Sequence, residues 1–354
     1  MTSRASRTVH EVPLVGPMTP RRTARAYFAL QSVAGALWWL GVATVPGVRT
    51  ATLGELPALP IAIADVLLFV LGSALVALDV RRAVPVVLGW TALVALGMAV
   101  YATVTTSAGA GAVLMIAATV ASVLAGVVVL HGRLPAERVL IGPLAFRSAP
   151  RRDRREHLAA TFAQILVFWP LFLAIIPLPV VLLERRWRLD LTLPDGSTDG
   201  AALAWSIASW SITAAGALVL IGASALGLWA AYVMSTLGRG TPLPSAMPRA
   251  LVIAGPYRWV RNPMAVSGVG QAVAVGMVAG SWMVVAYALA GGAIWHLLVR
   301  PHEERDLSER FGAPYEMYRS QVRCWIPRRR PLPGAPMPRG AAPRPAGGPG
   351  PRPA

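Results

Sequence analysis

Eight apolar stretches dominate the sequence, and most of them are long enough to cross a membrane. A bilayer core is spanned by about 20 apolar residues in a helix. Hydrophobic residues make up 55% of the chain and charged residues only 14%, whereas soluble domains carry about 25% charged residues. The sequence therefore predicts an all-α, polytopic transmembrane helical bundle of about eight spans, surrounded by the lipid bilayer. The stretches lie near residues 26–46, 58–79, 83–106, 110–131, 158–183, 203–236, 264–279 and 282–300.

Arginine is distributed unevenly between alternate loops. Residues 1–25 hold five Arg and one acidic residue, 132–157 hold seven Arg and three acids, and 238–263 hold four Arg and no acid. The loop 105–110 has no charge, and 184–200 has three Arg against four acids. Because basic residues accumulate in cytoplasmic loops, both termini are expected in the cytoplasm.

The net charge of +17 does not by itself indicate a nucleic-acid partner. All 33 basic residues are Arg, and they lie in loops and tails, where they orient a membrane protein. We therefore expect no nucleic acid among the partners. The Arg-only usage, together with abundant Ala, Gly, Pro and Val, is typical of a GC-rich bacterial genome. It favours a location in the bacterial inner (cell) membrane.

Charge and proline content divide the chain into five parts. Residues 328–354 belong to a Pro- and Arg-rich end without acidic residues, which buries little apolar surface and is expected to be disordered. The parts are a cytoplasmic basic arm, 1–25; a four-helix transmembrane region of unknown role, 26–131; a basic cytoplasmic linker, 132–157; a second membrane domain, 158–327; and the tail, 328–354.

Asp65 lies inside the second apolar stretch. An acidic residue within a membrane span is a functional candidate by default. Because Asp65 follows Pro57 by only eight residues, a position at the outer interface is the alternative.

The densest polar motif runs from Gly255 into the seventh apolar stretch. Gly255-Pro256 favours a turn, and Pro263 suits the first turn of a helix. Arg261 and Asn262 are then expected at a helix N-terminus on the membrane surface, where free N–H groups and an Arg fork favour an anion such as a carboxylate. The alternative is an ordinary positively charged flank with an aromatic belt.

A second polar motif follows the last apolar stretch. The helical pattern continues past Arg300 into Glu303 and Glu304, which places paired acids beyond the membrane. Tyr315 and Tyr318 follow at a spacing that lets them stack on a flat ring or dock the helix on the interface. A solvated helix end with Glu–Arg pairs is the alternative. The His and Glu spacing matches no recognised zinc site and Cys324 is the single cysteine, so no metal is expected.

Taken together and in order, these motifs resemble the isoprenylcysteine carboxyl methyltransferase and phospholipid methyltransferase superfamily of integral membrane enzymes. The resemblance covers residues 203–327, about a third of the chain. It rests on Ser235-Thr236-Leu237-Gly238-Arg239, Leu251 to Met264, Glu303-Glu304-x-x-Leu307, Phe311-Gly312-x-x-Tyr315-x-x-Tyr318 and Trp325-Ile326-Pro327.

The resemblance implies a methyltransferase-like domain over 158–327 that binds S-adenosyl-L-methionine at the cytoplasmic membrane face, outside any Rossmann fold. It implies catalytic roles for Arg261, Asn262 and Glu303. The implied cofactor-binding residues are Gly255, Pro256, Tyr257, Arg261, Asn262, Pro263, Glu303, Glu304, Tyr315 and Tyr318.

Two positions depart from the family pattern. Asn262 replaces the family His and cannot titrate, and Ala265 replaces a Tyr and removes a ring from the pocket wall. The implied methyl acceptor is a small hydrophobic, lipid or isoprenoid molecule. The alternatives are a non-catalytic membrane scaffold or transporter derived from the same fold, and an NADPH-dependent membrane reductase of related topology. The reductase would need a larger phosphate-binding set than four loop Arg residues.

Overall fold

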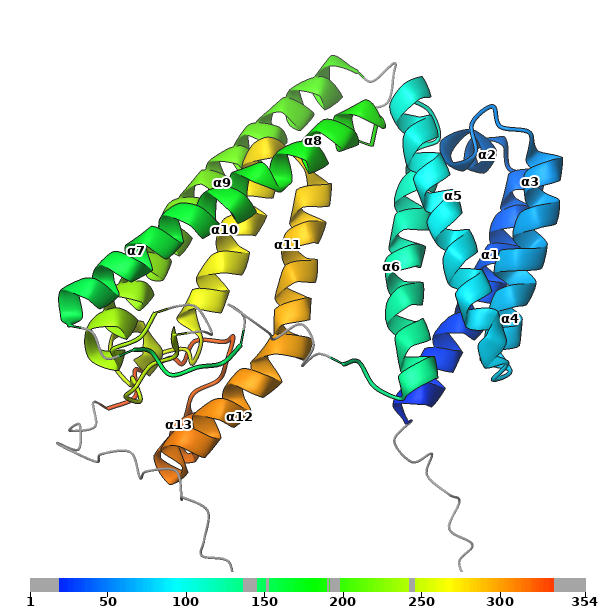
Figure 1. Cartoon of the computed structure of the whole chain (residues 1–354). Helices are drawn as coiled ribbons and strands as arrows, with labels where there is room; N and C mark the ends of the chain where they lie inside the picture. The colour runs from blue at the N-terminus through cyan, green and yellow to red at the C-terminus, as the bar shows by residue number, and fades with distance from the viewer. Residues whose placement is uncertain are drawn as a thin grey trace, which may run out of the picture. The chain divides into compact units, whose positions relative to one another are not determined.

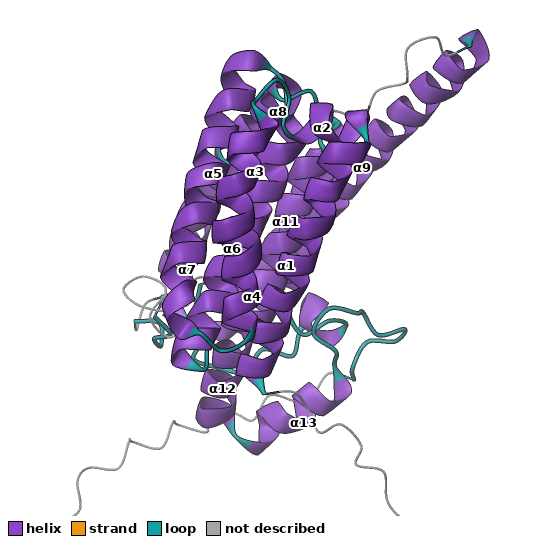
Figure 2. Cartoon of the chain, turned by 90° about the vertical axis from the view of Figure 1, so that its right-hand side faces the viewer, coloured by secondary structure: helices purple, strands orange, loops and turns teal. Residues whose placement is uncertain are grey.

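The computed structural model describes residues 19–135, 145–150, 153–189, 191, 198–241 and 246–333. Within these ranges every regular element is helical, as Figure 2 shows, which confirms the predicted all-α polytopic bundle. Seven of the described helical segments are long and apolar enough to cross a membrane: Pro20–Thr44, Ala58–Ala77, Arg81–Thr105, Gly109–His131, Arg154–Arg186, Asp199–Gly238 and Trp282–Phe311. The remaining expected stretch forms a shorter apolar helix, α10 (Pro263–Ala279), of 17 residues.

The chain divides into two compact units. Unit 1 comprises Met1–Pro135 with Arg186–Leu189, and unit 2 comprises Ala136–Arg185 with Asp190–Ala354. The helices of unit 1 are α1 (Pro20–Thr44), α2 (Pro46–Thr52), α3 (Ala58–Asp65), α4 (Gly72–Ala77), α5 (Val84–Thr105) and α6 (Gly109–His131).

Helices from four parts of the sequence form the core of unit 1. Phe28 of α1, Val76 of α4, Val87 of α5 and Val129 of α6 are buried in one apolar cluster. Small residues let the helices approach closely, as is common in membrane bundles. A Cβ added to Gly111 of α6 would come within 1.9 Å of the Thr52 carbonyl oxygen.

Unit 2 contains seven α-helices among the described residues, of which α9 is the longest in the described chain. They are α7 (Arg154–Pro170), α8 (Pro177–Arg186), α9 (Asp199–Val233), α10 (Pro263–Ala279), α11 (Trp282–Ile294), α12 (Arg300–Phe311) and α13 (Ala313–Gln321). A π-helical turn, Leu171–Ile175, joins α7 to α8 directly after Pro170. Proline removes a backbone donor, so a local break there is expected.

The α10–α11 hairpin sets the position of both polar motifs. Gly280 has a φ of 63° and ends α10, and α11 begins at Trp282. Glu184 of α8 accepts hydrogen bonds from the Trp282 backbone N–H, at 3.2 Å, and from the Ser281 hydroxyl. The hairpin is antiparallel (Figure 1), so the start of α10 and the end of α11 lie at the same end of unit 2.

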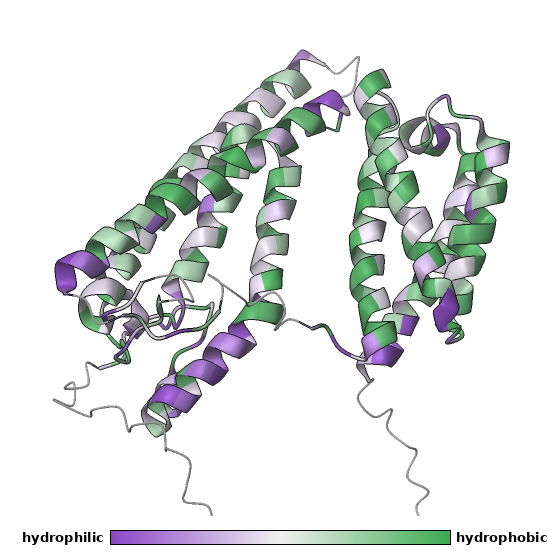
Figure 3. Ribbon diagram, in the orientation of Figure 1, coloured by the Kyte–Doolittle hydropathy of each residue, from purple (hydrophilic) through white to green (hydrophobic). Residues whose placement is uncertain are grey.

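The last span continues as a polar helix. A π-helical turn, Trp295–Val299, connects α11 to α12 without an intervening loop. Figure 3 shows that α12 is strongly hydrophilic where α11 is mainly apolar. Helix α12 therefore carries Glu303 and Glu304 beyond the apolar part of the helix.

The ordered C-terminal segment extends past Pro327, where we expected it to end. The Arg328 backbone N–H donates to the Trp259 carbonyl at 2.8 Å, and that of Leu332 to the Arg258 carbonyl at 2.9 Å. Leu332 also packs against Tyr315 and Tyr318. The rest of the predicted tail, 334–354, lies outside the described residues, as do 1–18 of the basic arm and 136–144 and 151–152 of the linker.

Candidate functional site

The loop before α10 is shaped by a tight turn. Gly255 has a φ of 52°, a conformation that favours glycine, and it opens a short 3₁₀ turn, Gly255–Arg258. Pro256 and Tyr257 are buried in this turn, and the Tyr257 ring packs on Ala230 and Val233 of α9. The turn thus anchors the loop to α9 and directs the following residues toward α10.

Asn262 caps the N-terminus of α10. Its side-chain oxygen accepts a hydrogen bond from the Ala265 backbone N–H at 3.0 Å, and Pro263 occupies the first helical position. The sequence predicted this helix start. The capping bond occupies the amide oxygen of Asn262, so the NH₂ group remains to act as a donor.

Arg261 and Glu304 form a close ion pair, although 43 residues separate them. Arg261 Nη2 lies 2.6 Å from Glu304 Oε1, and the two side chains are only 12% and 11% exposed. Arg261 Nη1 also donates to the carbonyls of Arg319, at 2.9 Å, and Val322, at 3.2 Å. Arg261 therefore ties the start of α10 to α12 and to the segment that ends α13.

Two more arginines surround Glu304. Arg300 Nη1 lies 3.3 Å from Glu304 Oε1, and Arg319 Nε lies 3.6 Å from Oε2. With Arg261, three guanidinium groups share one carboxylate. Arg319 Nη1 also lies 3.5 Å from Glu316 Oε2, so the cluster holds a second carboxylate beside the three guanidinium groups.

Glu303 is placed differently from its neighbour. It is half-buried, and it makes no hydrogen bond or ion pair within the described part of the chain. Glu303 lies close enough to Tyr257 to affect its pKa. Burial raises the pKa of Tyr257 well above its usual range, and the neighbouring Tyr318 and Glu303 raise it further. Burial, and then the Glu304 and Asp306 carboxylates, raise the pKa of Glu303 to about 7, so this unpaired group is partly protonated at neutral pH.

The two tyrosines of α13 line the interior of this end of unit 2. Tyr315 and Tyr318 are 1% and 4% exposed, and they pack with Val322, Leu307 and Phe311. Tyr318 Oη donates to the Tyr257 carbonyl at 2.7 Å. The Tyr315 hydroxyl is buried and has no hydrogen-bond partner among the described residues. An unpaired buried hydroxyl is unfavourable, which points to a ligand or water at this position.

Both phenols stay protonated at neutral pH. Burial raises the pKa of Tyr318 above its usual range. Burial, followed by the nearby Glu304 carboxylate, raises the pKa of Tyr315, against an opposing effect of Arg261. The Tyr315 hydroxyl is therefore a buried hydrogen-bond donor without a partner among the described residues.

Trp325 contacts the last membrane span at the start of the polar helix α12. Its indole N–H donates to His296 Nδ1 at 2.8 Å, and its ring meets Trp295 edge-on at a centroid distance of 5.4 Å. His296 is thus held by an indole. The described residues contain no group of three His, Cys, Asp or Glu side chains placed to hold a metal ion.

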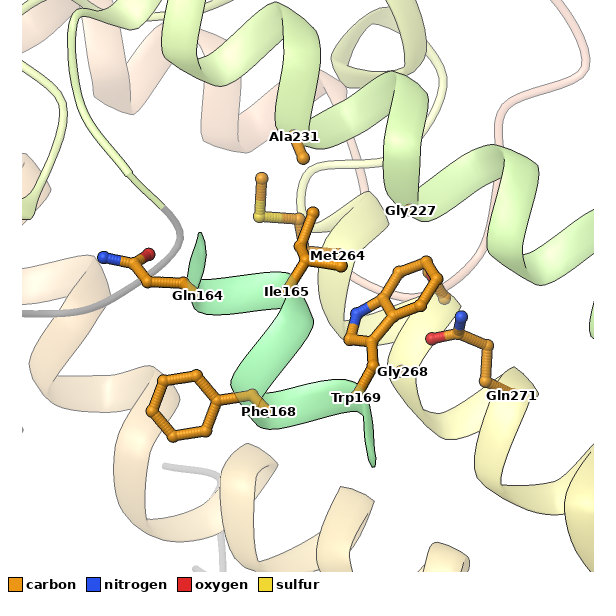
Figure 4. Close-up of a pocket in the computed structure, with 10 residues that line it drawn as sticks. Gln164, Ile165, Phe168, Trp169, Gly227, Ala231, Met264, Gly268 and Gln271 are labelled. Carbon is orange, nitrogen blue, oxygen red and sulfur yellow. The ribbon is translucent and has the colours of Figure 1, made fainter. Parts of the chain in front are cut away.

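An apolar cavity of about 180 Å³, partly open at the surface, lies between α7, α9 and α10. It begins at Met264, the second residue of α10, and extends along that helix to Gln271. Figure 4 shows Trp169 and Gln271 on one side of this pocket and Gln164 on the other. Sequence reasoning missed the cavity; the available signal was a Gln inside each of two apolar stretches.

Comparison with known proteins gives a match to a protein family. Residues 211–314 match the model of the phospholipid methyltransferase family. No curated protein and no solved structure matches the chain. The matched segment includes most of α9, all of α10, α11 and α12, and the Arg261–Glu304 pair. Together with the apolar helices, the match supports an integral membrane methyltransferase.

Proposed function

Because the C-terminal part of this chain belongs to the isoprenylcysteine and phospholipid methyltransferase superfamily, we propose that unit 2 is an S-adenosyl-L-methionine-dependent methyltransferase. Its acceptor is a small hydrophobic, lipid or isoprenoid molecule, and its active site faces the cytoplasm. The observation that carries the proposal is the pair of unsatisfied polar groups, Glu303 and the Tyr315 hydroxyl. They lie beside the Arg261–Glu304 ion pair, at the end of unit 2 from which the apolar cavity begins.

The available groups suit the parts of this cofactor. It carries a positively charged amine, which needs a hydrogen-bond acceptor, and a carboxylate, which needs hydrogen-bond donors. Its ribose hydroxyls can both donate and accept. The unpaired Glu303 carboxylate suits the amine or the ribose hydroxyls. The Tyr315 hydroxyl and the NH₂ group of Asn262 are hydrogen-bond donors that have no acceptor among the described residues. Both suit the carboxylate of the cofactor.

In this proposal the two glutamates have different roles. Glu304 is occupied by three arginines, so in this proposal it holds the site together, and Glu303 contacts the ligand. Arg261 acts chiefly by holding Glu304 and the end of α13. Gly255, Pro256 and Tyr257 form the turn that brings Arg261 into place, and Tyr318 fixes that turn by its bond to the Tyr257 carbonyl.

Methyl transfer needs little more than alignment and a dry site. The bound cofactor supplies an electrophilic methyl group on a sulfonium. The chain holds donor and acceptor in line, which supplies much of the rate acceleration. A position at the edge of the bilayer excludes water, which favours a reaction that disperses charge. Asn262 does not titrate, so the side chain at this position orients the reactants and does not take up a proton.

The cytoplasmic orientation rests on the Arg-rich loop that precedes α10. A reporter fused after Arg249 is expected to show cytoplasmic activity in a bacterial host. A signal on the outer side would separate the site from its cofactor, and the enzymatic proposal would then fail.

Calorimetric titration with S-adenosylhomocysteine tests cofactor binding. Glu303→Gln removes a carboxyl group that makes no bond in the described fold, so affinity is expected to fall about ten- to a hundredfold. The melting temperature should not decrease, because burial and the Glu304 carboxylate already disfavour the charged form of Glu303 in the folded state. Glu309→Gln, at an exposed position of the same helix, is the matched control and should bind like the wild type. Equal affinity for Glu303→Gln would remove Glu303 from the site. A wild type without saturable binding would favour the non-catalytic scaffold or transporter.

A further inference from the structure

Two glutamines lie within the apolar helices that surround the cavity of unit 2. Gln164 is on α7 and Gln271 is on α10, and both contribute to the cavity wall. A polar side chain inside a membrane segment is unfavourable unless its hydrogen-bonding groups are satisfied, and it often marks a functional position. The bonds that each amide makes therefore bear directly on the occupant of the cavity.

Each amide is satisfied at one end only. Gln271 Nε2 donates to the Ser224 hydroxyl at 2.9 Å, and Gln164 Nε2 donates to the Thr241 hydroxyl at 3.2 Å. The Gln164 amide oxygen is buried without a partner in the described part of the chain. The Gln271 side chain is 2% exposed, and its oxygen accepts no bond from a described residue. Turning an amide over would leave its NH₂ group unpaired instead, so one unsatisfied end remains in either orientation.

The rest of the lining is mainly apolar, and the hydroxyl of Ser267, which also lines the cavity, donates to the Ala223 carbonyl at 2.7 Å. Figure 4 shows the Gln271 amide beside the Trp169 indole, with Gln164 across the pocket. Met264 forms the end of the cavity next to Asn262, where the proposed methyl donor binds. A ligand that fills this space must be mainly apolar and must also carry a hydrogen-bonding group. A hydroxyl group fits either orientation of an amide, because it both donates and accepts.

We propose that this cavity binds the methyl acceptor as an apolar molecule that carries a hydroxyl group, and that Gln164 and Gln271 select for that hydroxyl. Gln164 accepts the hydroxyl proton in a hydrogen bond, and Gln271 provides a second polar contact across the pocket. The identification of this ligand as the methyl acceptor rests on the proposed function. Selection for a hydroxyl by the cavity does not, and it is testable without the cofactor.

Photolabelling with two matched probes tests the selection. The protein in lipid nanodiscs is irradiated with 4-hydroxybenzophenone or with benzophenone, and labelled peptides are identified by mass spectrometry. The hydroxylated probe is expected to label peptides containing 164–169 and 264–271 saturably, at about two- to tenfold lower concentration than benzophenone. Gln164→Leu should abolish or sharply reduce this preference. Equal labelling by both probes in the wild type, or a full preference in Gln164→Leu, overturns the proposal.

Glycine substitutions test whether the labelled space is this cavity. A Cβ added to Gly268, which lines the cavity, meets no atom within 4 Å, so the side chain of Gly268→Leu can enter the cavity without moving the backbone. Labelling should be lost in this variant. Gly222→Leu on α9 is the matched control, because an added Cβ there also meets nothing within 4 Å and Gly222 does not line the cavity. Undiminished labelling in Gly268→Leu overturns the proposal.

The two proposals fail independently. Hydroxyl-selective labelling of a protein that does not bind S-adenosylhomocysteine would refute the methyltransferase and retain the cavity as a hydroxyl-selective site. Normal S-adenosylhomocysteine binding without hydroxyl preference would retain the enzyme and refute the role of the glutamines.

Discussion

The two units treat polar side chains within their apolar helices in different ways. In unit 1 a buried network joins three helices: Gln31 Nε2 donates to Ser73 Oγ at 3.0 Å, and Ser122 Oγ donates to Gln31 Oε1 at 2.7 Å. Tyr27 bonds to the Gln31 amide oxygen as well, and lies 3.1 Å from Ser122 Oγ. Both ends of the Gln31 amide are thus satisfied within the unit.

Asp65 follows the same pattern. It is 5% exposed, and its two carboxylate oxygens accept the indole N–H groups of Trp39, at 2.8 Å, and Trp90, at 2.7 Å. The sequence left open whether this acid is functional or interfacial. Its burial and its two indole partners favour a third role, in which Asp65 holds α1, α3 and α5 together.

Unit 2 instead leaves polar groups without partners. The Gln164 amide oxygen and the Tyr315 hydroxyl are buried and unpaired among the described residues, and Glu303 makes no ion pair there. Buried polar groups are nearly always hydrogen-bonded, so such exceptions call for an explanation. The comparison indicates that Gln31 and Asp65 stabilise helix packing in unit 1, whereas in unit 2 Gln164 lines the cavity with its amide oxygen unpaired among the described residues.

The largest expected effect belongs to a polar cluster of unit 2 in which the charged side chains pair with one another. Glu304→Ala leaves Arg261, Arg300 and Arg319 without their shared carboxylate. Loss of one partner from a buried ion pair costs about 3–5 kcal/mol. Amide hydrogen exchange should show this as faster opening of α13, because Arg261 and Arg319 hold it against α10 and α12.

Glu309→Ala is the control for that experiment, since Glu309 is exposed on the same helix and makes no ion pair with a described residue. Exchange in α13 should match the wild type in this variant. If Glu304→Ala also exchanged like the wild type, the three-arginine cluster would contribute nothing to the fold, and the distinction between Glu303 and Glu304 would be lost.

A pair of equivalent substitutions compares the units directly. Gln31→Leu breaks a satisfied network and leaves Ser73 and Ser122 short of a partner, so thermal stability in detergent should fall by about 1–2 kcal/mol. Gln164→Leu removes an unpaired oxygen together with one hydrogen bond, so it should change stability by less than about 0.5 kcal/mol. Equal losses in the two variants would mean that the amide of Gln164 is as well satisfied as that of Gln31.

The sequence predicted the helical bundle because hydropathy and length alone identify membrane spans. It also predicted that Arg261 and the glutamates lie close together. A short turn at Gly280-Ser281 makes α10 and α11 antiparallel neighbours, which is a topological consequence of the hairpin. The site's role in binding remains a prediction.

Two features of the site could not be fully predicted from the sequence. Adjacent residues on a helix point about 100° apart, and Arg300, one turn before Glu304, favours pairing of Glu304 by its spacing alone. The closer pair with Arg261 and the contact with Arg319 come from other elements, which the sequence does not place. The amide of Gln271 is half-satisfied because Ser224 of α9 lies beside it. Such partners come from other helices, so spacing along the chain does not reveal which polar atoms remain unpaired.

The smallest expected effect concerns the tyrosines that close the candidate site. Burial raises the pKa of Tyr318, so the folded state keeps this proton while the unfolded chain loses it near pH 10. The folded state then binds more protons above pH 10, and its stability must fall as the pH rises. Hydrogen exchange in α13 should report a loss of less than about 1 kcal/mol from Tyr318 at pH 10.5, relative to pH 9.

Tyr318→Phe lacks the titrating hydroxyl and its bond to the Tyr257 carbonyl. The variant should start from lower stability at pH 9 and show a flatter decline. An identical decline in both proteins would mean that Tyr318 titrates in the folded state as it does in water, and that this end of unit 2 is open to solvent.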